Sequence, residues 1–123
     1  MDPSGLEQLT TTVQKAIDSG RIGVPSVVRW YVRTDSNATG DAAAAMARSM
    51  LASAAKWLGG DPASVSTFGT DSGPETVVHA TWSAGTTAVL TAASGPGETA
   101  NDLILLGSRG AIYFGRTPEA VGS

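Results

Sequence analysis

A single histidine and the lack of cysteine limit the chemistry that this 123-residue chain can perform. Without cysteine it can form neither a disulfide nor a thiolate metal site. The histidine, His79, could contact a ligand or a partner, although a solvated or hydrogen-bonded surface histidine is the commoner role. A catalytic dyad would need a Ser or Asp beside it, which the sequence does not show. We therefore predict no catalytic residue.

Acidic side chains and a glycine-flanked turn are the other candidates. The carboxylates have no metal-ligand spacing and fall mostly in predicted loops, so we expect no metal; they are Asp61, Asp71, Glu75, Glu98 and Asp102. Ser108 and Arg109 lie in a turn that could hold an anion, although such turns usually only join two strands.

Residues 95–100 read Gly-Pro-Gly-Glu-Thr-Ala and match a dinucleotide-binding pattern literally. A functional fingerprint follows a strand and opens a helix, because the helix N-terminus must meet the pyrophosphate. Here an apolar strand is predicted next, at residues 103–106. We interpret residues 95–100 as a loop and predict no bound cofactor.

Charge and hydropathy exclude two classes of partner. The formal net charge is −3 and the eight basic residues are scattered, which argues against binding to nucleic acid. No apolar stretch approaches the length of a membrane span, and residues 1–5 lack the features of a signal peptide. We expect no membrane association and a cytoplasmic location.

Hydrophobic periodicity predicts helices at residues 5–18 and 41–58, with a half-buried strand at 26–34 between them. Strands are predicted at residues 64–70, 76–82, 86–93, 103–106 and 111–114. Residues 103–106, Leu-Ile-Leu-Leu, do not alternate with polar residues, so this strand is expected to be central and covered on both faces.

This order of elements predicts one α+β domain spanning residues 1–123, with an ordered core at about 5–115. Its architecture would be two-layered: a mostly antiparallel, open-faced sheet with helices packed on one face. The alternation places a polar, Thr-rich and partly aromatic set on the open face, which could be solvated or could form an interface. Its members include Arg29, Arg33, His79, Thr81, Thr87 and Thr91.

Three segments resemble the C-terminal domain of the Gfo/Idh/MocA oxidoreductases, a family named for glucose–fructose oxidoreductase and inositol dehydrogenase. Residues 16–29 (AIDSGRIGVPSVVR) resemble the passage from a helix through Ser-Gly-x-Ile-Gly-x-Pro into a strand. Residues 55–65 (AKWLGGDPASV) resemble a helix end with Trp, Leu, Gly, an acid and Pro, and 103–113 (LILLGSRGAIY) resemble a strand hairpin.

The resemblance implies part of an enzyme. Family members have an N-terminal Rossmann domain for NAD or NADP, then a Glu-Lys-Pro segment with a catalytic lysine, and neither occurs here. In the family the long helix carries an Asp and a His four residues apart; counted back from Trp57, those positions are Met46 and Met50. A thioether does not transfer protons, so the two methionines could line a vestigial pocket or simply fill core.

The leading hypothesis is therefore a non-catalytic accessory or scaffolding subunit that forms a homodimer through its sheet face. Since the family's open sheet face commonly supports dimerisation, the resemblance suggests the interface residues Arg29, Tyr31, Arg33, His79, Thr81 and Val89. One alternative is a subunit of a split NAD(P)-dependent oxidoreductase whose Rossmann domain is a separate chain. Another is a small-molecule sensor that keeps the vestigial pocket.

Overall fold

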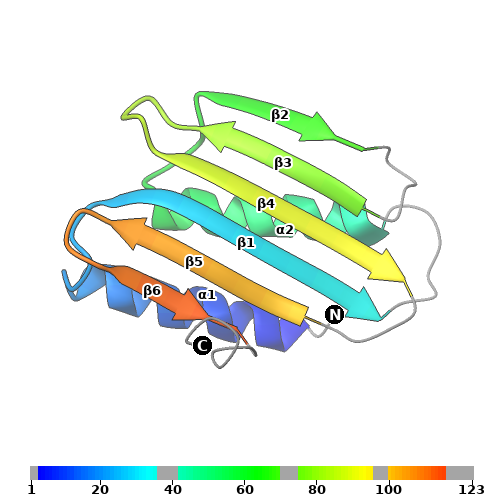
Figure 1. Ribbon diagram of the computed structural model, residues 1–123, viewed down its shortest axis with the longest axis horizontal. Coiled ribbons are helices and arrows are strands. Elements are labelled where there is room, and N and C mark those ends of the chain that lie inside the picture. Colours follow the sequence, from blue (N-terminus) through cyan, green and yellow to red (C-terminus); the bar gives the residue numbers. More distant parts are fainter. Residues whose placement is uncertain (1–2, 36–41, 70–74, 96–99, 116–123) are drawn as a thin grey trace, which may run out of the picture.

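The computed structural model describes residues 3–35, 42–69, 75–95 and 100–115 as two layers, a six-stranded sheet backed by two helices (Figure 1). Helices α1 (Pro3–Asp18) and α2 (Ala42–Trp57) lie on the same face of the sheet. The strands are β1 (Pro25–Asp35), β2 (Ser64–Phe68), β3 (Glu75–Thr81), β4 (Thr87–Gly95), β5 (Ala100–Gly107) and β6 (Ala111–Phe114). This confirms the predicted α+β class and the open-faced sheet.

The sheet order is β2-β3-β4-β1-β5-β6. Strands β1 and β4 pair in parallel, and every other neighbouring pair is antiparallel. Strands β4 and β5 follow each other in sequence, yet β1 lies between them. The first strand of the chain is thus one of the two central strands.

Glycines end the two helices and shape the hairpins. Gly20 and Gly59 have positive φ angles of 79° and 90°, the left-handed conformation that closes a helix C-terminus. The β3–β4 hairpin turns at Gly85, which also has a positive φ, and its amide donates to the carbonyl of Trp82. At Gly107, an added Cβ would collide with the backbone carbonyl oxygen of Ile22, so the β5–β6 hairpin fits closely against the chain before β1.

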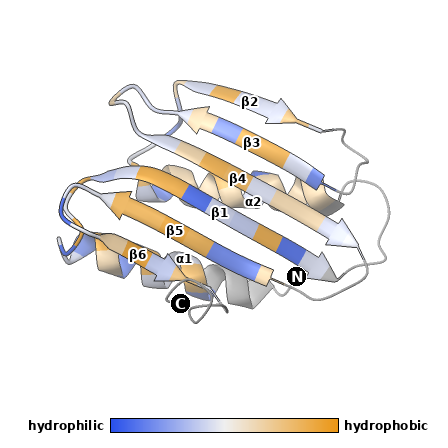
Figure 2. Cartoon of the chain, viewed as in Figure 1, coloured by the Kyte–Doolittle hydropathy of each residue, from blue (hydrophilic) through white to orange (hydrophobic). Residues whose placement is uncertain are grey.

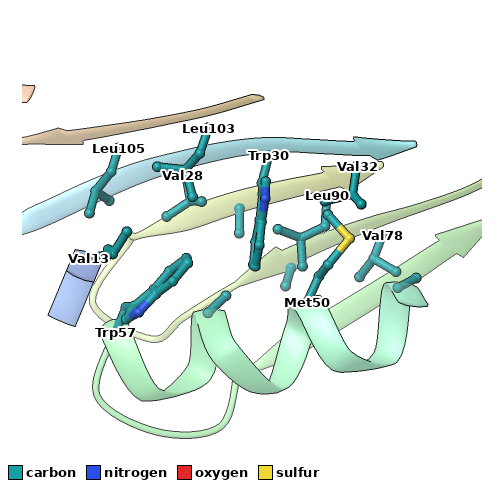
Figure 3. Packing of buried hydrophobic residues seen from close by; sticks show 14 of the residues in the cluster. Val13, Val28, Trp30, Val32, Met50, Trp57, Val78, Leu90, Leu103 and Leu105 are labelled. Atoms are coloured by element: carbon teal, nitrogen blue, oxygen red, sulfur yellow. The ribbon is translucent and has the colours of Figure 1, made fainter. Parts of the chain in front are cut away.

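Two tryptophans form the centre of the hydrophobic core. Trp30 of β1 and Trp57 of α2 are 2% and 3% exposed, and their ring centroids are 5.1 Å apart. Figure 3 shows side chains of the sheet, among them Val28 and Leu90, projecting toward Met50 and Trp57 on α2. Each indole N–H is also bonded: Trp30 Nε1 donates to Asn101 Oδ1 at 2.8 Å, and Trp57 Nε1 donates to the carbonyl of Thr10 at 3.2 Å.

The prediction that residues 103–106 are covered on both faces is wrong. Leu103 and Leu105 face the helices and are buried, but Ile104 is only half-buried and Leu106 is 39% exposed. Within the described residues both helices lie on one side, so the other side of β5 has no covering layer. The run of apolar residues therefore marks a surface of the protein as well as its interior.

Candidate functional site

The open sheet face is the surface on which the predicted interface residues meet. Alternation along β1 sends Val28, Trp30 and Val32 into the core and leaves the intervening side chains on the opposite side. The cross-strand register then places all six predicted residues on this face: Arg29, Tyr31, Arg33, His79, Thr81 and Val89. Arg29 and His79 are exposed, and the other four are half-buried.

A row of directly opposed side chains crosses the middle of this face. Arg29 of β1 lies opposite Val89 of β4 on one side and Ile104 of β5 on the other. Beyond them, Val89 lies opposite His79, and Ile104 lies opposite Tyr113. Polar and apolar groups thus alternate across the row.

Exposed apolar side chains also lie on this face and were not predicted from the sequence. Phe68 is 58% exposed, Tyr113 is 65% exposed, and Leu106 is 39% exposed, all on the side away from the helices. Figure 2 is viewed from this side and colours each residue whichever way its side chain faces; β5 is hydrophobic along much of its length, and β1 and β3 include hydrophilic positions. The non-alternating residues 103–106 were the signal that could have revealed them.

Charges of both signs lie on the same face. Arg29, Tyr31 and Arg33 follow one another along β1, and Asp102 of β5 lies opposite Tyr31. Asp102 Oδ1 is buried and has no hydrogen-bond partner among the described residues, and an added Cβ at Gly115 would lie 2.5 Å from it. Acidic and basic residues therefore share this face.

Helix α2 brings no proton-transfer group to the sheet. Its core positions are Ala43, Ala47, Met50, Ala54 and Trp57. Met50 is fully buried, and Met46 is half-buried at the margin of the same core. Whether the two methionines line a vestigial pocket stays a prediction. Among the described residues, no group of three or more His, Cys, Asp or Glu side chains could hold a metal ion.

The β5–β6 turn that could have held an anion is engaged with the chain instead. Ser108 Oγ accepts a hydrogen bond from the amide of Val24 at 2.9 Å. The amides of Ser108 and Arg109 donate to the carbonyls of Val24 and Ile22. These bonds position the start of β1.

The literal dinucleotide pattern at 95–100 leads into a strand. Gly95 ends β4 and Ala100 begins β5, while residues 96–99 lie outside the described part of the chain. A strand therefore follows the literal dinucleotide pattern, as expected. Across the described residues, no helix is long and apolar enough to cross a membrane.

Comparisons with known proteins report on the fold. No protein-family model matches the sequence, and no curated protein matches it either. Among solved structures, the chain is similar to a probable dehydrogenase from Thermotoga maritima, with a TM-score of 0.72 and 18% identity over 87% of this chain. It is also similar to the WlbA dehydrogenase from Bordetella pertussis, solved with NADH and UDP-GlcNAcA, with a TM-score of 0.70 and 20% identity over 86% of this chain.

These matches span only part of the larger proteins, 38% of the Thermotoga chain and 40% of the Bordetella chain. The same holds for myo-inositol 2-dehydrogenase from Lactobacillus plantarum, which matches with a TM-score of 0.63 and 15% identity over 85% of this chain and 38% of its own. The chain has the fold of the C-terminal domain of Gfo/Idh/MocA-type dehydrogenases.

Proposed function

We infer that this chain is a non-catalytic subunit that acts in assembly, self-associating through its open sheet face as an accessory or scaffolding component. One observation carries the proposal: residues 103–106 of β5 are apolar on both sides, although in the described part of the chain helices cover only one side. Ile104 and Leu106 lie on the uncovered side, half-buried and 39% exposed. The free side of an antiparallel sheet is ordinarily polar.

The composition of the face supports contact with another protein surface. Arginine and aromatic residues are enriched in interfaces, and Arg29, Tyr31 and Tyr113 all lie here. Burying the intervening apolar surface would contribute about 25 cal/mol for each Å² removed from water. A two-fold contact would present the same patch from both copies, which suits a surface that carries both charge signs.

The lack of suitable groups on α2 supports a non-catalytic role. The positions that the family resemblance assigns to an acid and an imidazole hold Met46 and Met50, and Met50 is enclosed in the core. Neither side chain can give or take a proton. The proposal places this assembly in the cytoplasm.

Thiol protection tests the proposed contact, because a cysteine introduced into this cysteine-free chain is unique. Val89→Cys places a thiol near the middle of the open face at a half-buried position. Its rate of reaction with a small disulfide reagent should fall about tenfold between dilute and concentrated protein, because association covers it by mass action.

Ala52→Cys is the matched control, since Ala52 is exposed on α2 in the other layer. Its reaction rate should not depend on protein concentration. Equal rates for Val89→Cys at all concentrations would contradict self-association through this face.

The second candidate is a subunit of a split NAD(P)-dependent oxidoreductase. It is favoured by the fold match to 40% of a dehydrogenase solved with NADH. As such a subunit or as a sensor, the chain could bind NADH by itself. Its free energy of unfolding should then rise by about 2.7 kcal/mol when the NADH concentration is 100 times the dissociation constant. We expect NADH to leave the melting temperature unchanged; a rise that saturates with NADH would favour the second candidate.

A further inference from the structure

Strand β2 forms an edge of the sheet and is exposed on both sides. All five of its residues, Ser64–Phe68, are exposed, and Val65 and Phe68 remain 46% and 58% accessible. Figure 1 shows β2 extending past the helix layer, with α2 behind the strands next to it. In the described part of the chain, β3 is its only neighbouring strand. One row of backbone donors and acceptors of β2 therefore faces outward.

This edge lacks the features that normally prevent strand pairing. Edge strands are usually protected by charged residues, proline or a bulge, whereas β2 reads Ser-Val-Ser-Thr-Phe and keeps an uninterrupted register with β3. Its Val, Thr and Phe residues favour strands. At the opposite edge, β6 is one residue shorter, and two of its four residues, Ala111 and Ile112, are half-buried. Strand β2 is thus the longer and more exposed of the two edge strands.

We propose that β2 pairs antiparallel with β2 of a second copy, about a two-fold axis that passes through Ser66. Ser66 then lies opposite Ser66 of the second copy, Val65 opposite Thr67, and Ser64 opposite Phe68. Two six-stranded sheets join into one continuous sheet, with both helix layers on the same side. This surface is separate from the open face and goes beyond the proposed function.

The strand's own sequence favours a copy of itself as the occupant. The five residues of β2 carry no charge, so two copies of the strand do not repel each other along the edge. Val65 and Thr67 share the helix side, so the two-fold pairing joins two β-branched residues across the strands. Ser64, Ser66 and Phe68 share the open side through their partners Thr81, His79 and Val77. The open faces of the two copies therefore become continuous.

Charged substitutions at residues 65 and 67 test whether the β2 strands pair and in which register. Val65→Lys combined with Thr67→Lys sets lysines opposite each other twice about the axis, so the weight-average mass from light scattering should halve. Val65→Lys combined with Thr67→Glu sets lysine opposite glutamate in the same register, so the mass should return to that of the wild type. Both positions are exposed, so both variants should keep the wild-type circular dichroism spectrum.

A crosslink tests the axis independently of charge. Directly opposed antiparallel residues have Cα atoms about 4.5–5.5 Å apart, within the range of about 4.4–6.8 Å that a disulfide spans. Ser66→Cys should therefore give a disulfide-linked dimer under mild oxidation, whereas Ser83→Cys, at an exposed turn position, should not. The proposal is overturned if the Lys/Lys variant keeps the wild-type mass, if the Lys/Glu variant stays dissociated, or if the two cysteine variants crosslink equally.

The experiments distinguish the β2 edge contact from the open-face contact. If only the edge pairs, Val89→Cys reacts at one rate at all concentrations while Ser66→Cys still crosslinks. If only the open face pairs, Val89→Cys is protected at high concentration while the Lys/Lys variant keeps the wild-type mass.

Discussion

Replacing Trp30 with alanine is expected to lower the free energy of unfolding by about 4 kcal/mol, within the range for aromatic-to-alanine changes in cores. Trp30 is 2% exposed and packs against Trp57 at a centroid separation of 5.1 Å. The change leaves a cavity between the layers and removes the donor to Asn101 Oδ1. Because small domains are stable by only about 5–15 kcal/mol in total, the loss is a large fraction.

Denaturation in urea, followed by far-ultraviolet circular dichroism at one fixed protein concentration, measures this effect. Tyr113→Ala, measured at a protein concentration too low for open-face association, is the control, since Tyr113 is aromatic but 65% exposed on β6. We expect a loss of less than about 1 kcal/mol there. Equal losses for the two variants would show that the interlayer core is not organised around the tryptophan pair.

The second large effect concerns assembly. Ile104→Lys should raise the dissociation constant of the open-face contact about 100-fold, as expected when a charge replaces an apolar residue at the centre of an interface. Ile104 lies opposite Arg29 in the middle row, so the new ammonium group adds a like charge as well as a desolvation cost. In the isolated chain the site is only half-buried, and a lysine can keep its charge in water there.

Ala52→Lys is the control for adding a positive charge. Ala52 is exposed on α2, away from the open face. Its substitution should leave the dissociation constant unchanged, and analytical ultracentrifugation can compare the two variants. If both substitutions raised the dissociation constant equally, the change in net charge, and not the position of Ile104 in the interface, would explain the effect.

Local sequence patterns predicted the elements because their causes are local. The 3.6-residue period placed α1 and α2 within two residues of their observed ends. Glycines at helix ends and in hairpins set the boundaries, and simple alternation identified which residues of β1 and β3 face the core.

The order of the strands did not follow from local patterns. Strand β1 lies between β4 and β5, which are consecutive in the second half of the chain. That choice depends on packing between distant residues, such as the contact of Trp30 with Trp57 and its hydrogen bond to Asn101. The same dependence explains the error over residues 103–106, since a run of apolar residues does not reveal which side a helix covers.

The candidate site was predicted in part. Alternation and the family resemblance identified polar members such as Arg29 and His79, because a polar residue within an alternating strand usually faces away from the core. The apolar members Phe68, Leu106 and Tyr113 were missed, because sequence reasoning assigns apolar residues to the interior by default. That β2 is exposed on both sides could also be seen only in the structure.

Static light scattering over a range of concentrations tests the central claim, that the open face of this chain mediates self-association, most directly. The mass of the Ile104→Lys variant is measured under the same conditions, and a lower mass than that of the wild type assigns the association to the open face. We predict that the wild-type chain reaches at least twice its monomer mass of 12.4 kDa. Combining Ile104→Lys with Val65→Lys and Thr67→Lys should return the mass to 12.4 kDa at the same concentrations. A wild-type mass of 12.4 kDa at every concentration, or an associated mass that Ile104→Lys leaves unchanged, would contradict the account.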